Sequence, residues 1–233
     1  MSKFLLGLGV FCLSMAAQAS IVIQGTRVVY PGDAKSIDVG ITNPDQSPAL
    51  IQSWIEQGDQ SNQTKIPFII TPPLTRIEAN TEQSLRVRYT GEALPSNQES
   101  LFYLNILDVP PKPKNAQEEQ SYLQVTILSR LKFFYRPKGL PYSIDEAYDK
   151  VMWQLQGQSL ALHNPTPYYI TYAALAIKDA NQTVVQSISE IDMIAPFSTQ
   201  TIELQQHAPN ATSVQWYIIN DYGATQHGTS KLQ

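Results

Sequence analysis

Short segments of alternating apolar and polar residues recur along most of the chain, and they restrict it to β-structure. Residues 36–42 alternate through Ile37, Val39 and Ile41, and residues 83–89 repeat the pattern. A period of two places every second side chain on the same face of a strand. Prolines and asparagines separate these segments, and few windows have the period of a helix. This combination predicts an all-β fold built from sandwiches.

The segments fall into two groups, which predicts two domains. About seven expected strands occupy residues 20–138, the size of one immunoglobulin-like sandwich. Residues 139–233 carry a second, smaller sandwich, and residues 143–150 are expected to form a short helical or irregular link between them. The expected strands cover residues 21–30 with an interruption at Gly25, 36–42, 50–56, 65–70, 83–89, 99–107 and 121–137, then 151–154, 159–163, 170–178, 183–187, 199–204 and 213–220.

Residues 1–19 are typical of a secretion signal. Lys3 supplies the basic end, residues 4–15 form an apolar run too short to span a bilayer comfortably, and residues 17–19 form a small-x-small cleavage site. Cleavage removes Lys3 and the single cysteine, Cys12, which leaves 15 basic against 20 acidic residues and a net charge of −5. An exported chain without cysteines depends on its core for stability. Its mild acidity argues against nucleic-acid binding.

No catalytic or metal-binding constellation can be assembled, so we expect neither an enzyme nor a cofactor. His163, His207 and His227 are far apart, and none has a metal-ligand neighbour two or four residues away. The motifs of the serine nucleophile elbow, the phosphate loop and the zinc proteases are missing. A periplasmic hydrolase on a β-sandwich is the enzymatic alternative, for which the sequence offers no site.

Residues 121–137, SYLQVTILSRLKFFYRP, allow two interpretations. Leu123, Val125 and Ile127 share one face of an extended strand. That apolar row can pack into the core of its own sandwich, which the pattern alone favours, or it can lie on an edge and be offered to another protein. Lys132 is out of phase with the row, so it faces the other side of the sheet unless a twist or a bulge intervenes.

Three charged residues, Glu99, Arg136 and Asp221, are expected inside apolar strands. A buried charge must be paired or it destabilises the fold. Two acids and one arginine can therefore form one linked cluster at the junction of the domains. The alternative is that they are three unrelated charges at strand ends, each facing water.

Seven motifs, in order through both domains, resemble the PapD-like periplasmic chaperones of the chaperone–usher pilus pathway. Together they extend over nearly the whole chain after residue 19. The motifs are TRVVYPG (26–32), NPDQSPALIQSWIE (43–56), PFIITPPLTRIE (67–78), LPSNQESLFYLNILDVPP (94–111), SRLKFFYRP (129–137), NPTPYYIT (164–171) and INDYG (219–223).

The resemblance implies two immunoglobulin-like domains in an L or boomerang arrangement with an interdomain cleft. It implies a periplasmic chaperone whose partners are pilus subunits, both pilins and a tip adhesin, and an outer-membrane usher that receives them. Such a chaperone lends the last strand of its first domain to a subunit that lacks its own final strand, a form of β-augmentation called donor-strand complementation. No ATP is expected to be used.

The resemblance also carries roles onto residues of this sequence. Arg27 and Lys132 match the cleft residues that grip the carboxylate at the C-terminus of the subunit. The donor strand covers about 121–137, and its donor residues are Leu123, Val125 and Ile127. The cluster of interdomain charges is Glu99, Arg136 and Asp221, the same three residues that burial considerations select.

The short loop before the donor strand and the lack of mature cysteines resemble the short-loop branch of the family, which usually serves rod-like pili with adhesive tips. A structural pilin or adhesin is the alternative within exported immunoglobulin-like proteins. Two complete sandwiches without a cysteine argue against it. The sequence leaves open whether the free chain covers its apolar edge by transient self-association.

Overall fold

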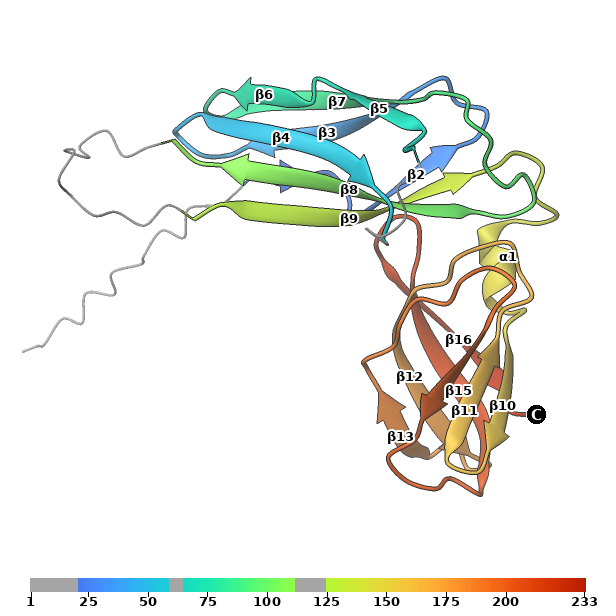
Figure 1. Cartoon of the computed structure of the whole chain (residues 1–233). Helices are drawn as coiled ribbons and strands as arrows, with labels where there is room; N and C mark the ends of the chain where they lie inside the picture. Colours follow the sequence, from blue (N-terminus) through green and yellow to red (C-terminus); the bar gives the residue numbers. More distant parts are fainter. Residues whose placement is uncertain (1–20, 59–64, 112–124) are drawn as a thin grey trace, which may run out of the picture.

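Two β-sandwiches form the arms of an L in the computed structural model, which describes residues 21–58, 65–111 and 125–233 (Figure 1). The first sandwich contains β1 to β9. The second contains β10 to β16 and is preceded by the short helix α1 at the corner of the L. The expected signal at residues 1–19 lies outside the described residues. The prediction of two all-β sandwich domains is confirmed.

The first sandwich packs a four-stranded sheet, ordered β1-β3-β7-β5, on a five-stranded sheet, ordered β2-β9-β8-β4-β6. The strands are β1 (Val22–Ile23), β2 (Arg27–Pro31), β3 (Ile37–Asn43), β4 (Ala49–Glu56), β5 (Phe68–Thr71), β6 (Leu74–Ile77), β7 (Thr81–Tyr89), β8 (Ser100–Val109) and β9 (Ile127–Arg136).

The first expected strand divides between the two sheets. β1 pairs with β3, and β2 then runs parallel to β9 in the other sheet. Gly25 lies at the crossing with φ +86°, a left-handed conformation that glycine adopts without strain. The interruption expected at Gly25 is therefore the point at which the chain changes sheets.

The core of the first domain is the apolar row that alternation predicts. In β4 the residues Ile51 and Ile55 are buried while Leu50 and Gln52 are exposed. Rings from both sheets meet in its centre, where Phe68 lies 4.8 Å from Phe133 in an edge-on contact. The other rings of this group are Tyr30, Tyr89, Phe102 and Tyr135.

The second sandwich packs the sheet β10-β11-β14 on the sheet β13-β12-β15-β16. Its core is centred on Trp153, Tyr172 and Trp216. The strands are β10 (Met152–Gln156), β11 (Ser159–His163), β12 (Tyr172–Asp179), β13 (Val184–Ile188), β14 (Thr199–Glu203), β15 (Ala211–Ile219) and β16 (Thr225–Lys231).

Two strands have no predicted counterpart. β6 is only four residues long and follows Pro72 and Pro73. The residues of β16, TQHGTSK, alternate between half-buried and exposed polar side chains rather than between apolar and polar ones. The expected link at residues 143–150 contains the helix α1 (Ile144–Tyr148), which Ser143 and Glu146 close with a reciprocal capping box. The S-x-x-E spacing could have identified the start of this helix.

The register of β9 shows which face of the sheet carries Lys132. Its register with β8 runs without a shift from Ile127 opposite Asp108 to Tyr135 opposite Ser100, so it contains no bulge. Leu131, Phe133 and Tyr135 point into the core, and Lys132 therefore lies on the opposite face of the sheet.

Candidate functional site

Arg27 and Lys132 lie side by side where the two domains meet. In the parallel pairing of β2 with β9, Arg27 is directly opposite Lys132. Their neighbours Val28 and Phe133 are buried in the core, so the two cations share the outer face of the five-stranded sheet. The resemblance assigned these residues to one site, and the register brings them together.

The second domain holds both cations. Nη1 of Arg27 donates a hydrogen bond of 2.8 Å to the carbonyl oxygen of Ile219, and Nζ of Lys132 lies 3.4 Å from Oγ1 of Thr171. The backbone N–H of Ile219 in turn donates to the carbonyl oxygen of Thr171 at 2.9 Å. Two hydrogen-bonded segments of the second domain therefore position the two side chains.

Arg27 keeps an unused donor. Its Nε is buried and has no hydrogen-bond partner within the described part of the chain. Buried polar groups in proteins are nearly always paired, so this donor can be satisfied by a water molecule or by an acceptor on a ligand. Nε lies on an edge of the guanidinium group, which is the part that receives a carboxylate.

Electrostatics favour an anion at the same place. Burial lowers the pKa of Arg27, and burial followed by the charge of Arg27 lowers the pKa of Lys132 below its usual range. The acidic neighbours Asp221 and Asp192 act in the opposite direction on Arg27 and Lys132 respectively. A carboxylate between the two cations would relieve their mutual repulsion.

The predicted charge cluster is assembled beside this pair. Nε of Arg136 donates to Glu99 at 2.7 Å, and its two terminal nitrogens donate to Asp221 at 2.7 and 3.0 Å. Although burial acts against it, Asp221 and Glu99 raise the pKa of Arg136. One arginine from the end of the first domain therefore pairs with an acid from each domain.

The placement of this cluster corrects the sequence expectation in one respect. Arg136 is the last residue of β9, but Glu99 precedes β8 and Asp221 lies in the turn between β15 and β16. The carboxylate of Glu99, 1% exposed, also accepts the backbone N–H of Tyr169, while the N–H of Glu99 donates to the carbonyl oxygen of Pro167. Glu99 is thus fastened to the second domain through backbone as well as side chain.

Sequence reasoning missed the second domain's contribution to the cation pair. Ile219 accepts through its backbone carbonyl oxygen, which every residue type carries, so the sequence could not identify it. Thr171 and Gly223 both lie within motifs of the resemblance but carried no assigned role. A Cβ atom on Gly223 would lie 2.4 Å from Oγ1 of Thr26, so the turn that carries Asp221 packs closely on the first domain.

The predicted donor residues lie beside an unpaired edge. Residues 127–131 pair with β8 on one side, and among the described residues no strand pairs with them on the other. Ile127 is 46% exposed, and Val125, which precedes β9, is 60% exposed. Leu128 is also exposed. Leu123 lies outside the described residues.

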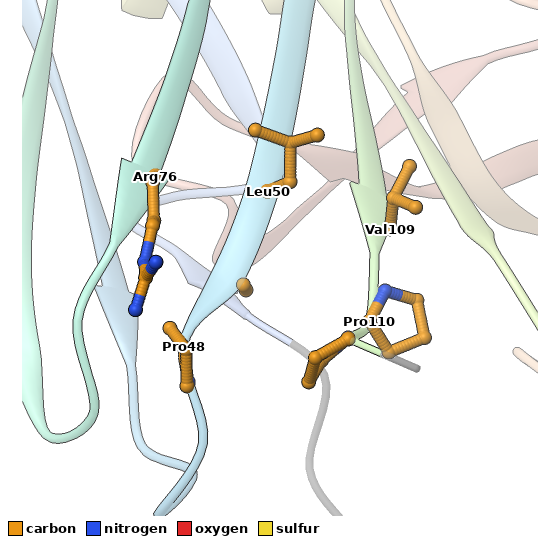
Figure 2. A pocket seen from close by; sticks show the side chains of 7 residues that line it. Pro48, Leu50, Arg76, Val109 and Pro110 are labelled. Carbon is orange, nitrogen blue, oxygen red and sulfur yellow. The ribbon is translucent and has the colours of Figure 1, made fainter. Parts of the chain in front are cut away.

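An apolar hollow lies at the end of the five-stranded sheet away from the second domain. It has a volume of about 420 Å³ and is lined by Pro48, Leu50, Arg76, Val109 and Pro110, among others (Figure 2). Its one charged side chain, Arg76, is paired with Glu78 at 2.9 Å. The hollow therefore offers no pair of groups for acid–base or nucleophilic chemistry.

The described residues also lack two further kinds of feature. No group of three or more His, Cys, Asp or Glu side chains is arranged there to hold a metal ion. No helix within residues 21–58, 65–111 and 125–233 is long and apolar enough to cross a membrane.

Two family models match the chain in succession. Residues 20–141 match the N-terminal domain of PapD, described as a pili and flagellar-assembly chaperone. Residues 146–230 match the C-terminal domain of PapD, described as a pili assembly chaperone. Together they extend over both sandwiches and the residues of the junction.

Individual proteins are similar over nearly the full length. The chaperone protein HifB of Haemophilus influenzae is 40% identical over 226 residues, which is 94% of this chain and 91% of HifB. The probable fimbrial chaperone YadV of Escherichia coli K12 is 36% identical, over 96% of this chain and 95% of YadV.

Solved structures are similar in fold. The crystal structure of the YadV chaperone has a TM-score of 0.76 at 35% identity, over 92% of this chain and 100% of that chain. The complex of the Salmonella enterica SafA pilin with the SafB chaperone matches with a TM-score of 0.77 at 26% identity, over 91% of this chain and 96% of that chain.

Proposed function

The chain belongs to the PapD family of pilus-assembly chaperones, and from this membership we propose how its described residues capture a subunit. The protein is a periplasmic chaperone of the chaperone–usher pathway that binds pilin subunits, and its family is one of chaperones rather than enzymes. In the proposed mechanism the subunit's C-terminal carboxylate binds between Arg27 and Lys132. The edge of β9 and the residues before it then complete the subunit's sandwich.

The observation that carries this proposal is the unused donor of Arg27. Among the described residues the buried Nε of Arg27 has no acceptor, and it lies beside a lysine whose pKa is lowered by burial and by Arg27, so the two cations together favour an anion. A terminal carboxylate offers two oxygens, one for each cation, and charge-assisted hydrogen bonds of this kind are the strong ones. The contact also sets the register of any strand that continues along β9.

The donor role rests on exposure and on the open edge. Val125 and Ile127 are exposed apolar side chains next to unpaired backbone, and Leu123 is the third proposed donor residue. Burial of such side chains in a subunit groove contributes about 1.5–3 kcal/mol each before ordering costs. Main-chain hydrogen bonds to the free side of β9 add affinity without depending on the subunit's sequence.

Glu99, Arg136 and Asp221 are proposed to keep the two domains in the orientation that this site needs. Arg27 and Lys132 are each hydrogen-bonded to an atom of the second domain, so rotation of that domain would release both. The charge cluster links the domains without using either cation of the anchor.

The remaining assignments extend this proposal. The signal ends at residue 19, the first domain covers residues 20–138 and the second covers residues 139–233. The chain belongs to the short-loop branch, it delivers pilins and a tip adhesin to an outer-membrane usher, and the free chaperone covers its β9 edge by transient self-association. A rise in apparent mass with concentration in sedimentation, abolished by Ile127→Asp, is the expected sign of that association.

The anchor is tested with a donor-deficient subunit from the same operon. Arg27→Ala and Lys132→Ala are each expected to lower the yield of the periplasmic chaperone–subunit complex at least tenfold, because each leaves the carboxylate with one cation. Arg86→Ala is the matched control, since it removes an arginine paired with Asp38 on the other sheet. Unchanged yield with both anchor variants would show that the carboxylate binds elsewhere.

A further inference from the structure

Arg130 connects three strands on the face of the sheet that carries Lys132. It extends from β9, and the carbon of its guanidinium group lies 3.7 Å from the centre of the Tyr103 ring on β8. Its Nε donates a hydrogen bond of 3.0 Å to Oε1 of Glu56 on β4. A cation–π contact and an ion pair therefore converge on one side chain.

Glu56 and Tyr103, the two partners of Arg130, are positioned by further contacts. Nε1 of Trp54 donates to the other oxygen of Glu56 at 3.2 Å. A Cβ atom on Gly58 would lie 2.9 Å from Cε2 of Tyr103, so the backbone at Gly58 packs closely on that ring. Tyr103 and Glu56 are opposite each other in the register of β4 with β8. The network thus provides a fixed platform for Arg130 rather than a pair of freely moving surface side chains.

The position of this network along β9 is informative. Arg130 lies within residues 127–131, the half of β9 that has β8 on one side and no paired strand on the other among the described residues. Residues 132–135 are paired on both sides. An edge strand held by a single ladder opens locally more easily than a central one. Arg130 adds side-chain contacts to the half that lacks the second ladder.

The charge of Arg130 is already balanced by Glu56, which separates its role from that of Arg27 and Lys132. The side chain of Glu56 is 26% exposed and that of Arg130 is 41% exposed, so the ion pair contributes little to overall stability. Its effect is expected in the local order of the strand.

We propose that Arg130, Tyr103 and Glu56 form a clamp that holds the unpaired half of β9 extended, and thereby sets how fast the chaperone captures a subunit. A strand already extended on its sheet loses less conformational freedom when a second strand pairs with it. Arg130 is a positioning residue in this scheme and makes no contact with the subunit. The inference rests on the proposed donor role of the β9 edge.

Hydrogen exchange of the free chaperone provides the first test. Arg130→Ala is expected to increase amide exchange several-fold within residues 127–131 and to leave residues 132–136 and the second domain unchanged. Arg86→Ala, which breaks an exposed Arg–Asp pair on the other sheet, is the matched control and is expected to change neither segment. An unchanged exchange rate at residues 127–131 in Arg130→Ala overturns the clamp.

Capture kinetics provide the second test. With a purified donor-deficient subunit in stopped-flow mixing, Arg130→Ala is expected to lower the association rate constant about three- to tenfold, the range spanned by an exposed cation–π contact and ion pair. The dissociation rate is expected to change less than twofold. Arg130→Lys keeps the charge but not the planar stack, so it should give an intermediate association rate. An effect confined to dissociation would instead make Arg130 a direct contact and refute the proposal.

Different results overturn the donor role of the β9 edge and the clamp. If Ile127→Asp captures subunits normally, the donor role of the edge is wrong, whatever Arg130→Ala does. If Ile127→Asp and Lys132→Ala abolish capture while Arg130→Ala has the association rate and the exchange of the unaltered chain, the proposed function stands and the clamp is wrong.

Discussion

Arg27 and Lys132 belong to the first domain, yet each is hydrogen-bonded to the second, through Ile219 and Thr171. These contacts hold two like charges side by side at a partly buried position. Such an arrangement has an electrostatic cost in the free protein, because burial and mutual repulsion both disfavour the charged forms. In the proposed mechanism a bound carboxylate would offset the mutual repulsion of the two cations, and this offset would contribute to its affinity.

The lowered pKa of Lys132 gives a prediction at the residue scale. The proposed anchor requires the ammonium form of Lys132, so the affinity for the carboxylate should be full below the pKa of Lys132 in the free protein and fall as the pH rises through it. Because burial and Arg27 lower that pKa, the fall should begin at a lower pH than for an ordinary lysine. Dissociation constants for a peptide of the subunit's C-terminal segment, measured from pH 7 to pH 10, test this.

Lys132→Arg is the control for this titration. An arginine stays charged throughout the range, so the variant should bind with an affinity that does not fall over the same interval. An equal fall in both proteins would assign the pH dependence to another group.

The strand β9 combines two environments along one element. Its second half supplies Leu131, Phe133 and Tyr135 to the core, while its first residue, Ile127, is 46% exposed beside an unpaired edge. The second half of β9 is therefore a core strand, and the first half has the exposure expected of an edge that binds another protein. The unbroken register with β8 makes the two halves one continuous strand.

Two substitutions in β9 should separate these environments. Ile127→Asp is expected to abolish subunit capture. Because Ile127 is exposed, the substitution should change the free energy of unfolding of the free chaperone by no more than about 0.5 kcal/mol. Phe133→Ala, at a fully buried position, should destabilise the first domain by about 3–5 kcal/mol. Urea denaturation and co-purification measure the two effects. Loss of folding in Ile127→Asp would instead place Ile127 in the core.

At the scale of the whole molecule, the L depends on a small junction rather than on a shared core. The two hydrophobic clusters contain separate sets of residues, one ending at Tyr135 and the other beginning at Tyr148. The domains are joined by the charge cluster, by the hydrogen bonds of Arg27 and Lys132, and by the backbone contact of Glu99 with Pro167. The rings of Phe134 and Tyr169 also meet across the junction, with their centres 5.8 Å apart. The relative orientation of the domains is therefore set mainly by polar contacts around one aromatic contact.

Arg136→Ala tests this dependence. It leaves Glu99 buried without its cation, and breaking a buried pair in this way costs about 3–5 kcal/mol. We expect a lower urea midpoint and, in small-angle scattering, a wider range of interdomain orientations. Lys138→Ala is the matched control, because Lys138 is an exposed residue 3.9 Å from Asp33 and its loss should cost at most about 1 kcal/mol. Equal effects from both substitutions would argue against the cluster as the link.

The sequence by itself determined the class of the fold, the two sandwiches and most of the strands. Period-two alternation is visible in consecutive residues of one strand, whichever strands it pairs with. The sequence also selected Glu99, Arg136 and Asp221 as charges that need one another. It missed β6, a four-residue strand directly after two prolines, and β16, whose polar residues carry no apolar alternation. It also placed Glu99 and Asp221 inside strands although both lie just outside them.

The tertiary structure alone decided which residues meet. Arg27 becomes the neighbour of Lys132 only through the parallel register of β2 with β9, and the unpaired edge at residues 127–131 exists because β2 pairs with the later half of that strand only. The hydrogen bond from Arg27 to the carbonyl oxygen of Ile219 and the stacking of Arg130 on Tyr103 likewise depend on how distant segments pack. Register between distant strands depends on how whole sheets pack, and no local pattern of residue types encodes it.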